Sequence, residues 1–169
     1  MAEKNIQTVI LNHQQIGQKI NRIAHEILEN NFQEKSIVIL GIKEEGFILA
    51  QRLVSILETI SDMQIELHDI KLNKRNPLAS GLSSSVEPTA LKNKIVILVD
   101  DVLNSGKTLV YSTKFLLDHN IKGLQTVCLV DRKHRKFPIR ADYVGLTLST
   151  TLKEHITVKF GKSDSVFLD

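Results

Sequence analysis

Residues 95–108 restrict the fold of this chain more than any other stretch. Five branched apolar residues, from Ile95 to Val99, are typical of a buried strand in a parallel sheet. Two adjacent carboxylates, Asp100 and Asp101, stand at the end of this strand, and a Ser-Gly-Lys-Thr turn precedes a helical pattern. A helix N-terminus suits a phosphate, and paired aspartates suit hydroxyl groups or a metal carried by the ligand. The stretch therefore predicts a site for a ribose phosphate.

Strand and helix patterns alternate along most of the 169 residues. Isoleucines at 16, 20, 23 and 27 mark one face of a helix that follows Asn12, which can act as its N-cap. The other predicted helices are 47–57 and 106–119, a tight turn is expected at 43–46, and the predicted strands are 8–11, 36–40, 64–72, 95–99, 124–130, 142–146, 155–160 and 166–168. The first and last strands are expected at sheet edges. This order predicts a single α/β domain with a mainly parallel twisted sheet flanked by helices.

Ligands of such sheets bind beyond the carboxyl ends of the strands. Three loops are expected to meet there: 43–46, 100–108 and the segment that begins at Asp131. A fourth stretch, 73–91, has no usable periodicity and contains two prolines and three consecutive serines. A loop of this length in a compact domain is usually functional or disordered.

Composition limits the class of protein. The net charge of +3 is too small to indicate a nucleic-acid partner by itself, although basic residues gather between Arg132 and Arg140. Cys128 is the only cysteine and lies in an apolar run, so it is expected to be an inert core residue. Neither an N-terminal apolar run nor a stretch of about 20 apolar residues is present. We therefore expect a soluble cytoplasmic protein with no membrane association.

Two other phosphate motifs do not fit residues 99–108. The nucleotide P-loop needs a glycine where this chain has Asp101, and the three-glycine dinucleotide fingerprint is absent. Receiver domains carry an acidic pair on their first strand, whereas this pair stands at positions 100 and 101. A lone acidic pair would indicate no more than a strand end beside a helix cap, so the full pattern of ten residues carries the argument.

The ten residues 99–108 resemble the phosphoribosyl-pyrophosphate (PRPP) loop of type I phosphoribosyltransferases. Three further blocks narrow the resemblance: Arg-Ile-Ala-His-Glu at 22–26, Gly-Ile-Lys at 41–43, and residues 130–145, which include Phe-Pro-Ile-Arg-Ala-Asp-Tyr-Val-Gly. In their order and spacing they are similar to the pyrimidine-operon attenuator/uracil phosphoribosyltransferase family (PyrR). The resemblance covers residues 8 to 160.

The resemblance implies a set of site residues. Asp100 and Asp101 would be the catalytic pair that holds the ribose hydroxyls, directly or through Mg²⁺ bound by way of the ligand. The PRPP-binding residues would be Asp100, Asp101, Leu103, Asn104, Ser105, Gly106, Lys107 and Thr108. The pyrophosphate loop would be Lys43, Glu44, Glu45 and Gly46.

The same resemblance assigns the neighbouring segments. Residues 73–91 would form a flexible loop over the reacting centre, where Lys74 and Arg75 could help to offset the pyrophosphate charge. Asp131 and Arg132 would border the base and begin a small hood segment, 131–160. The relatives are oligomeric, so a homo-oligomer is expected.

The implied activity is Mg²⁺-dependent transfer of ribose 5-phosphate from PRPP to a pyrimidine base, with uracil giving UMP. Two residues depart from the pattern. Asn104 stands where 6-oxopurine enzymes usually have Asp and uracil-type relatives usually have Tyr, so it does not identify the base. Glu45 stands where a basic residue is common, and two adjacent carboxylates would repel pyrophosphate unless Mg²⁺ intervenes. A transferase for a purine or another base is the alternative.

A second implied activity is binding of pyrimidine-operon leader mRNA. The positions implied for RNA contacts are Arg22, His25, Lys43, His134 and Arg140. Outside the resemblance, a solvated helix face and a basic loop would account for the same residues. A regulator with weak or no catalysis therefore remains a further alternative.

Overall fold

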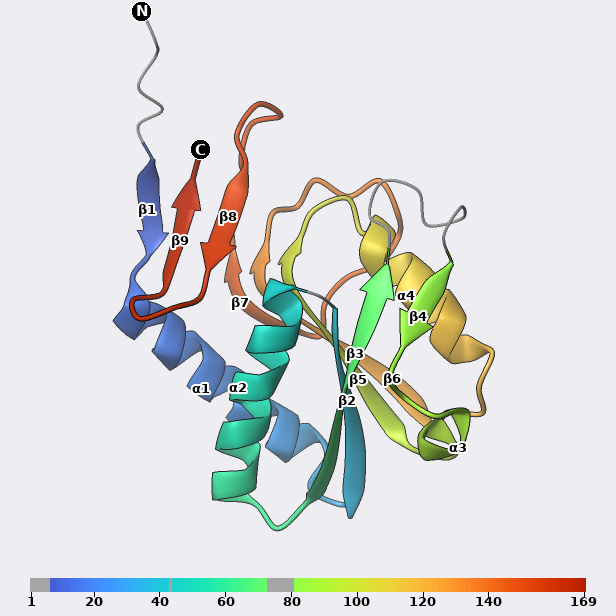
Figure 1. The fold of residues 1–169 in the computed structure, drawn as a ribbon. Coiled ribbons are helices and arrows are strands. Elements are labelled where there is room, and N and C mark those ends of the chain that lie inside the picture. Colours follow the sequence, from blue (N-terminus) through green and yellow to red (C-terminus); the bar gives the residue numbers. More distant parts are fainter. Residues whose placement is uncertain (1–6, 43, 73–80) are drawn as a thin grey trace, which may run out of the picture.

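The computed structural model describes residues 7–42, 44–72 and 81–169 (Figure 1). Three residues of the predicted site, Lys43, Lys74 and Arg75, lie outside these ranges.

A six-stranded sheet forms the centre of the molecule, in the order β4-β3-β2-β5-β6-β7. The strands are β2 (Ser36–Ile42), β3 (Gln64–Leu72), β4 (Leu82–Ser84), β5 (Ile95–Leu103), β6 (Gly123–Asp131) and β7 (Tyr143–Thr147). Neighbouring strands are parallel, except that β4 runs antiparallel to β3. The predicted α/β class with a mainly parallel sheet is confirmed.

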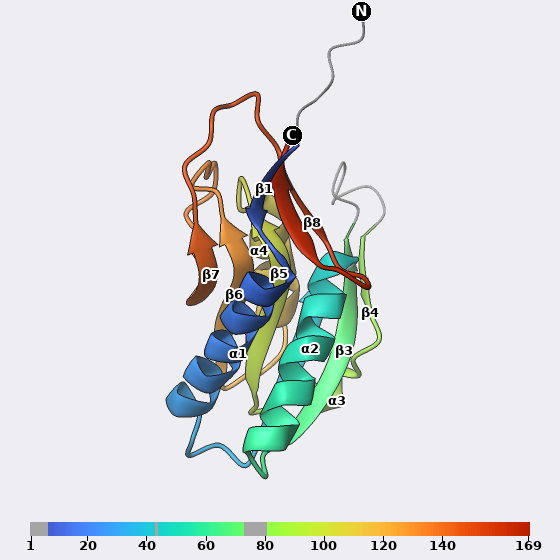
Figure 2. The same cartoon turned by 90° about the vertical axis from the view of Figure 1, so that its left-hand side faces the viewer.

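Helices cover both faces of this sheet, as predicted (Figure 2). Helices α1 (His13–Asn30) and α2 (Glu45–Ile60) pack on one face, and α3 (Pro88–Leu91) and α4 (Lys107–Leu117) on the other. Helix α1 begins with a capping box, in which Asn12 Oδ1 accepts from the Gln15 N–H at 2.9 Å and Gln15 Oε1 accepts from the Asn12 N–H at 2.9 Å. Its four predicted isoleucines are all buried.

Strand β5 is buried on both faces, which explains its uninterrupted apolar sequence. Ile97 and Val99 pack into the core beneath α1 and α2. Val96 and Leu98 pack into the core beneath α3 and α4. Because successive residues point to opposite faces, β5 holds both cores at one end of the strand and reaches the predicted site at the other.

A second, three-stranded antiparallel sheet has the order β1-β9-β8. It joins β1 (Thr8–Leu11) to β8 (Ile156–Lys159) and β9 (Ser165–Leu168). Residues 166–168 were expected at an edge, but β9 lies between the other two strands. Strand β9 has apolar residues facing the core and a partner strand on each side. An apolar run of three residues does not distinguish such a central strand from an edge strand. Of the predicted hood segment, β7 belongs to the main sheet and β8 to this one.

Two local predictions need correction. Residues 73–91 were expected to be an irregular loop, but this stretch contains β4 and α3. Strand β4 pairs with β3, and a side chain that gives no apolar pattern adds to this pairing: Ser84 Oγ donates to Asp69 O at 2.6 Å and accepts from the Val86 N–H at 3.2 Å. Residues 45 and 46 were expected in a turn, but they already belong to α2, which begins at Glu45.

Candidate functional site

The acidic pair lies near the C-terminal end of β5, just before the predicted phosphate-binding turn at residues 104–108. Strand β5 continues to Leu103, beyond both aspartates. Asp100 is only 3 % exposed, and its Oδ1 accepts the N–H of Asp101 at 3.0 Å. Asp101 is partly exposed. One carboxylate is thus held firmly by the fold, and the other lies closer to solvent.

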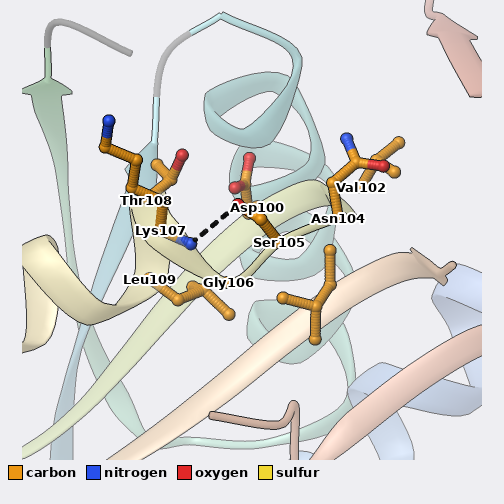
Figure 3. A pocket seen from close by; sticks show the side chains of 9 residues that line it. Asp100, Val102, Asn104, Ser105, Gly106, Lys107, Thr108 and Leu109 are labelled. Carbon is orange, nitrogen blue, oxygen red and sulfur yellow. Dashed lines mark hydrogen bonds between the residues drawn. The ribbon is translucent and has the colours of Figure 1, made fainter. Parts of the chain in front are cut away.

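Gly106 lets the chain turn from β5 into α4. Its φ angle of 83° lies in the left-handed region, which favours glycine. A Cβ atom at this position would lie 2.6 Å from Cγ2 of Ile139. The turn is closed by Ser105 Oγ, which accepts the Lys107 N–H at 3.3 Å (Figure 3). Glycine is therefore needed at position 106 both for its backbone angle and for space.

A small pocket of about 50 Å³ lies at this turn. Its lining residues are Asp100, Val102, Leu103, Asn104, Ser105, Gly106, Lys107, Thr108 and Leu109. A single water needs at least about 10–15 Å³, so the pocket takes a group of several heavy atoms, such as a phosphate. Helix α4 begins at Lys107, and the first N–H groups of a helix have no partner within it. The geometry suits an anion.

The N-terminus of α2 also reaches the end of β5. A Cβ atom on Gly46 would lie 2.9 Å from Val99 O and 3.1 Å from Asp100 Cα. The positive ends of α2 and α4 therefore flank Asp100 (Figure 3). The side chain of Glu45 reaches the small sheet, where its Oε2 accepts the N–H of Phe160 at 3.4 Å. Two helix N-termini beside one acidic pair can hold two phosphate groups.

The predicted base-bordering residues, Asp131 and Arg132, lie beside the turn at the end of β6. The Arg132 N–H donates to Leu103 O at 3.0 Å, which joins the ends of β5 and β6. Asp131 is buried: its Oδ1 accepts the Lys133 N–H at 2.9 Å, and its Oδ2 pairs with Arg135.

Arg132 is 6 % exposed and holds a loop that the sequence did not single out. Its Nε donates to Thr150 Oγ1 at 2.6 Å, and its Nη2 donates to the carbonyl oxygens of Thr151, at 2.9 Å, and of Glu154. Glu154 closes the same loop by accepting the Thr151 N–H at 2.6 Å, and this bond is the main reason that the pKa of its carboxyl lies below the ordinary value. Nothing in residues 150–154 predicted these contacts, because two of the three bonds from Arg132 go to backbone carbonyls, which any residue can supply.

The basic segment after β6, residues 132–140, is hydrogen-bonded to the phosphate turn, residues 104–108. The backbone N–H groups of Lys136 and Phe137 both donate to Ser105 O, at 2.9 and 3.1 Å. Ile139 of the same segment contacts Gly106 and packs in the core beneath α4. Residues 136–139 are therefore part of the architecture of the turn, a role that their basic composition did not predict.

The predicted RNA-binding positions divide between two parts of the molecule. Arg22 and His25 lie on α1, and Arg22 Nη2 donates to Val144 O at 2.8 Å and Gly145 O at 3.0 Å of β7. His134 lies near the end of β6, with Nε2 2.6 Å from Thr150 O. Arg140 is exposed beyond Ile139. Arg22 is exposed and also joins α1 to β7, whereas the side chain of Arg140 is exposed on the basic segment after β6.

None of the helices in ranges 7–42, 44–72 and 81–169 is long and apolar enough to cross a membrane. Within these ranges, no group of three or more His, Cys, Asp or Glu side chains could hold a metal ion.

Solved structures similar to this chain share its fold. A hypoxanthine phosphoribosyltransferase of Trypanosoma cruzi superposes with a TM-score of 0.72 at 18 % identity, covering 85 % of this chain and 78 % of that one. A hypoxanthine-guanine phosphoribosyltransferase of Bacillus anthracis superposes with a TM-score of 0.70 at 21 % identity, covering 83 % of each chain.

Sequence comparison identifies the family. Residues 7–161 match the model of the phosphoribosyl transferase domain. The bifunctional protein PyrR of Macrococcus caseolyticus is 37 % identical over 162 residues, 92 % of this chain and 93 % of the relative. That of Bacillus subtilis is 37 % identical over 172 residues, 95 % of this chain and 93 % of the relative. The chain therefore belongs to the PyrR family and is a phosphoribosyltransferase.

Proposed function

We propose that this protein transfers ribose 5-phosphate from PRPP to uracil, which gives UMP and pyrophosphate. The observation that carries the proposal is the acidic pair, Asp100 and Asp101, between the N-termini of α2 and α4. The ligand has a diol flanked by a 5′-phosphate and a pyrophosphate. The α4 turn suits the 5′-phosphate, the pair suits the diol, and the start of α2 suits the pyrophosphate.

The residues of the site fit a magnesium ion carried by the ligand. Mg²⁺ commonly binds through one or two carboxylates together with substrate phosphates and water. Asp100 and Asp101 supply the carboxylates, and the described residues offer no larger cluster of ligating groups. When bound with PRPP, the ion would neutralise charge on the leaving pyrophosphate.

The reaction breaks the bond from ribose C1 to pyrophosphate and forms a bond from C1 to N1 of uracil, which loses its proton. Positive charge develops on the sugar in the transition state. Catalysis therefore depends on holding the sugar, placing the base and excluding water more than on a nucleophile. Asp100 suits this task because its burial and its bond from Asp101 fix the carboxylate before the ligand arrives.

Glu45 is compatible with this arrangement. Its carboxylate is engaged with the Phe160 N–H, on the side of the small sheet. The repulsion expected between Glu45 and pyrophosphate is thereby reduced, because a charge directed towards a backbone donor is partly compensated.

Pyrophosphate release tests the proposal. The purified protein is mixed with Mg²⁺, PRPP and one base at a time: uracil, cytosine, hypoxanthine or guanine. We expect UMP and pyrophosphate in equal amounts with uracil, and much slower release with the other bases. PRPP binding without product from uracil would rule out the uracil transferase. Faster reaction with a purine would assign the site to the alternative class.

Matched variants connect this activity to the site. Asp101→Asn should lower kcat/KM for uracil by about 100-fold, on the scale of losing a group that acts on the transition state. Glu58→Gln makes the same chemical change on an exposed part of α2 and should have no effect. If the two variants behaved alike, the acidic pair would not be the site.

A second function is binding of pyrimidine-operon leader RNA, which the word bifunctional in the names of the relatives suggests. The observation in its favour is the exposed Arg140 on a segment whose backbone holds the phosphate turn. Basic side chains that contact RNA phosphates make the affinity fall steeply with salt.

Titration of the leader RNA at several salt concentrations tests this second function. Arg140→Ala should weaken binding and reduce the slope of log K against log salt by about 0.7–1. Lys92→Ala, an exposed residue at the opposite end of the sheet, is the control. Absent binding, or binding that salt does not change, would leave the protein as a transferase without this regulatory role.

A further inference from the structure

Arg132 is a buried cation whose side chain bonds to neutral oxygens. Three of its hydrogen bonds go to the 150–154 loop, to Thr150 Oγ1 and to the carbonyls of Thr151 and Glu154. The fourth goes from Nη1 to Oδ1 of Asn104, at 3.3 Å, on the other side of the guanidinium. Arg132 thus links the loop to the one residue of the phosphate turn that departs from both groups of relatives considered above.

This contact fixes the orientation of the Asn104 amide. A guanidinium has only donors, so the amide must turn its oxygen towards Arg132. The NH₂ group then points away from Arg132. Asn104 is exposed and lines the pocket on the side of Asp100 opposite Lys107 and Thr108 (Figure 3). A ligand with its phosphate at the α4 turn would extend past this amide.

We propose that Arg132 is a positioning residue, which orients Asn104 so that its NH₂ group donates a hydrogen bond to a carbonyl oxygen of the accepting base. This inference rests on the proposed function and adds the chemical basis of its specificity. An amide that is free to rotate can offer either a donor or an acceptor, so it discriminates poorly. An amide locked by Arg132 offers a donor only, and it favours bases with an oxygen at that position.

Arg132 could also serve only to anchor the 150–154 loop. That role would alter the stability of the loop and the overall rate. It would not alter the preference for one atom of the base over another. The two roles are therefore distinguished by the ratio of kcat/KM values for two bases rather than by the activity with either base.

Comparison of uracil with its two thio analogues measures that ratio. In 2-thiouracil and in 4-thiouracil, one carbonyl oxygen is replaced by sulfur, a much weaker acceptor. We expect the wild-type protein to prefer uracil over one of the two analogues by about tenfold in kcat/KM, the scale of one hydrogen bond. Asn104→Ala should abolish that preference, which is a ratio of kcat/KM values measured at the same PRPP concentration.

Substitution of Arg132 tests the positioning role. Arg132→Met should reduce the preference to about threefold or less in the wild-type background and leave it unchanged in the Asn104→Ala background. Thr150→Val removes another bond to the same guanidinium, at Nε, and should leave the ratio intact. If Arg132→Met does not fold, Arg132→Lys, which keeps the charge but has no planar fork, should show an intermediate ratio.

The outcomes separate this inference from the function on which it rests. Failure of the wild-type protein to use uracil while it binds PRPP would overturn both. Normal use of uracil with equal discrimination in the wild-type and Asn104→Ala proteins would overturn only the role of Asn104. Full discrimination in both Arg132 variants would show that Asn104 is oriented without Arg132, which would overturn the positioning role.

Discussion

Arg52 on α2 and Asp164 in the turn between β8 and β9 form a two-pronged ion pair, with Nη1 bonded to Oδ2 and Nη2 bonded to Oδ1 at 2.9 Å. Asp164 is only 2 % exposed and also accepts the Gly161 N–H at 2.9 Å. The same guanidinium lies 4.6 Å from the centre of the Phe160 ring. The small sheet is therefore fastened to the helix whose N-terminus borders the site.

Arg52→Met should destabilise the fold, because it leaves the Asp164 carboxylate buried without its main partner. We expect a loss of about 2 kcal/mol in the free energy of unfolding, below the value for a fully buried pair because Arg52 is partly exposed. Urea denaturation measures it. Lys122→Met removes a more exposed ion pair, with Glu34, and should cost less than about 1 kcal/mol. Equal losses in the two variants would show that the buried Arg52 pair stabilises the fold no more than an exposed ion pair does.

The same pair predicts how stability depends on pH. Hydrogen bonds from Arg52, followed by that from Gly161, hold the pKa of Asp164 below its ordinary value. A carboxyl whose pKa is lower in the folded state stabilises the fold above its unfolded pKa of about 3.9, and this contribution is lost as the pH falls through the folded value. The difference in stability between the wild type and Asp164→Asn should therefore shrink as the pH falls below about 5.

Unfolding midpoints of both proteins from pH 7 to pH 3 test this dependence. Glu154 also has a lowered pKa, but it is common to both proteins, so their difference reports Asp164 together with its partners Arg52 and His13. A difference that stayed constant to pH 3 would contradict the assignment.

Gly106→Ala should weaken PRPP binding by at least about tenfold, because the new Cβ strains the left-handed turn and meets Ile139. Gly81→Ala is the matched control, since Gly81 also has a positive φ of 67° but open space around it. Adding Ile139→Ala to Gly106→Ala should restore part of the affinity. Calorimetric titration with PRPP measures all four proteins. No restoration would mean that the backbone angle alone matters.

Glu45→Gln should keep the contact to Phe160, because an amide oxygen also accepts a hydrogen bond, while it removes a negative charge beside the start of α2. We expect the KM for PRPP to fall roughly two- to fivefold at low salt, with a smaller effect at high salt. Glu45→Ala removes both the charge and the contact, so it should also lower stability. A higher KM for Glu45→Gln would indicate that the carboxylate takes part in binding through a cation.

Cys128 should resist thiol reagents in the folded protein. Burial raises the pKa of its thiol, and the nearby carboxylates of Asp131 and Asp100 raise it further, so little reactive thiolate forms. A chromogenic disulfide reagent should react with less than about a tenth of the thiol in native buffer and with all of it in urea. Rapid labelling without denaturant would show that the end of β6 opens readily.

The features that could be predicted from the sequence were those in which buried residues give a regular apolar spacing along the chain. Ile95 to Val99 predicted a central strand because both of its faces meet a helix layer, and the isoleucines of α1 predicted a helix face. The position of β9 in the middle of its sheet was not predictable, because strand order depends on partners distant in the chain. Strand β4 was missed because it is only three residues long and is held by backbone pairing with β3 and by the Ser84 hydroxyl, neither of which gives an apolar pattern.

In the candidate site, too, the parts that form a contiguous motif were predicted and the parts that depend on distant contacts were not. Asp100, Asp101 and the turn at Gly106 were predicted from a contiguous motif, and they line one pocket or lie beside it. The loop at 150–154 was not predicted, because two backbone carbonyls and one common hydroxyl, that of Thr150, bind Arg132. The implied roles of Lys43, Lys74 and Arg75 stay predictions, since these residues lie outside the described ranges.

The pairing within the small sheet also determines which parts of the chain can fold first during translation. Strand β1 pairs with β9, so that Thr8 lies opposite Leu168. A nascent chain that has released the whole six-stranded sheet from the ribosome still lacks the partner that β1 needs. Residues 8–11 must wait, unpaired, for nearly the full time of translation, and contacts of such long sequence separation form slowly. The protein thus passes through a stage in which the turn at Gly106 can form before the three-stranded sheet is complete.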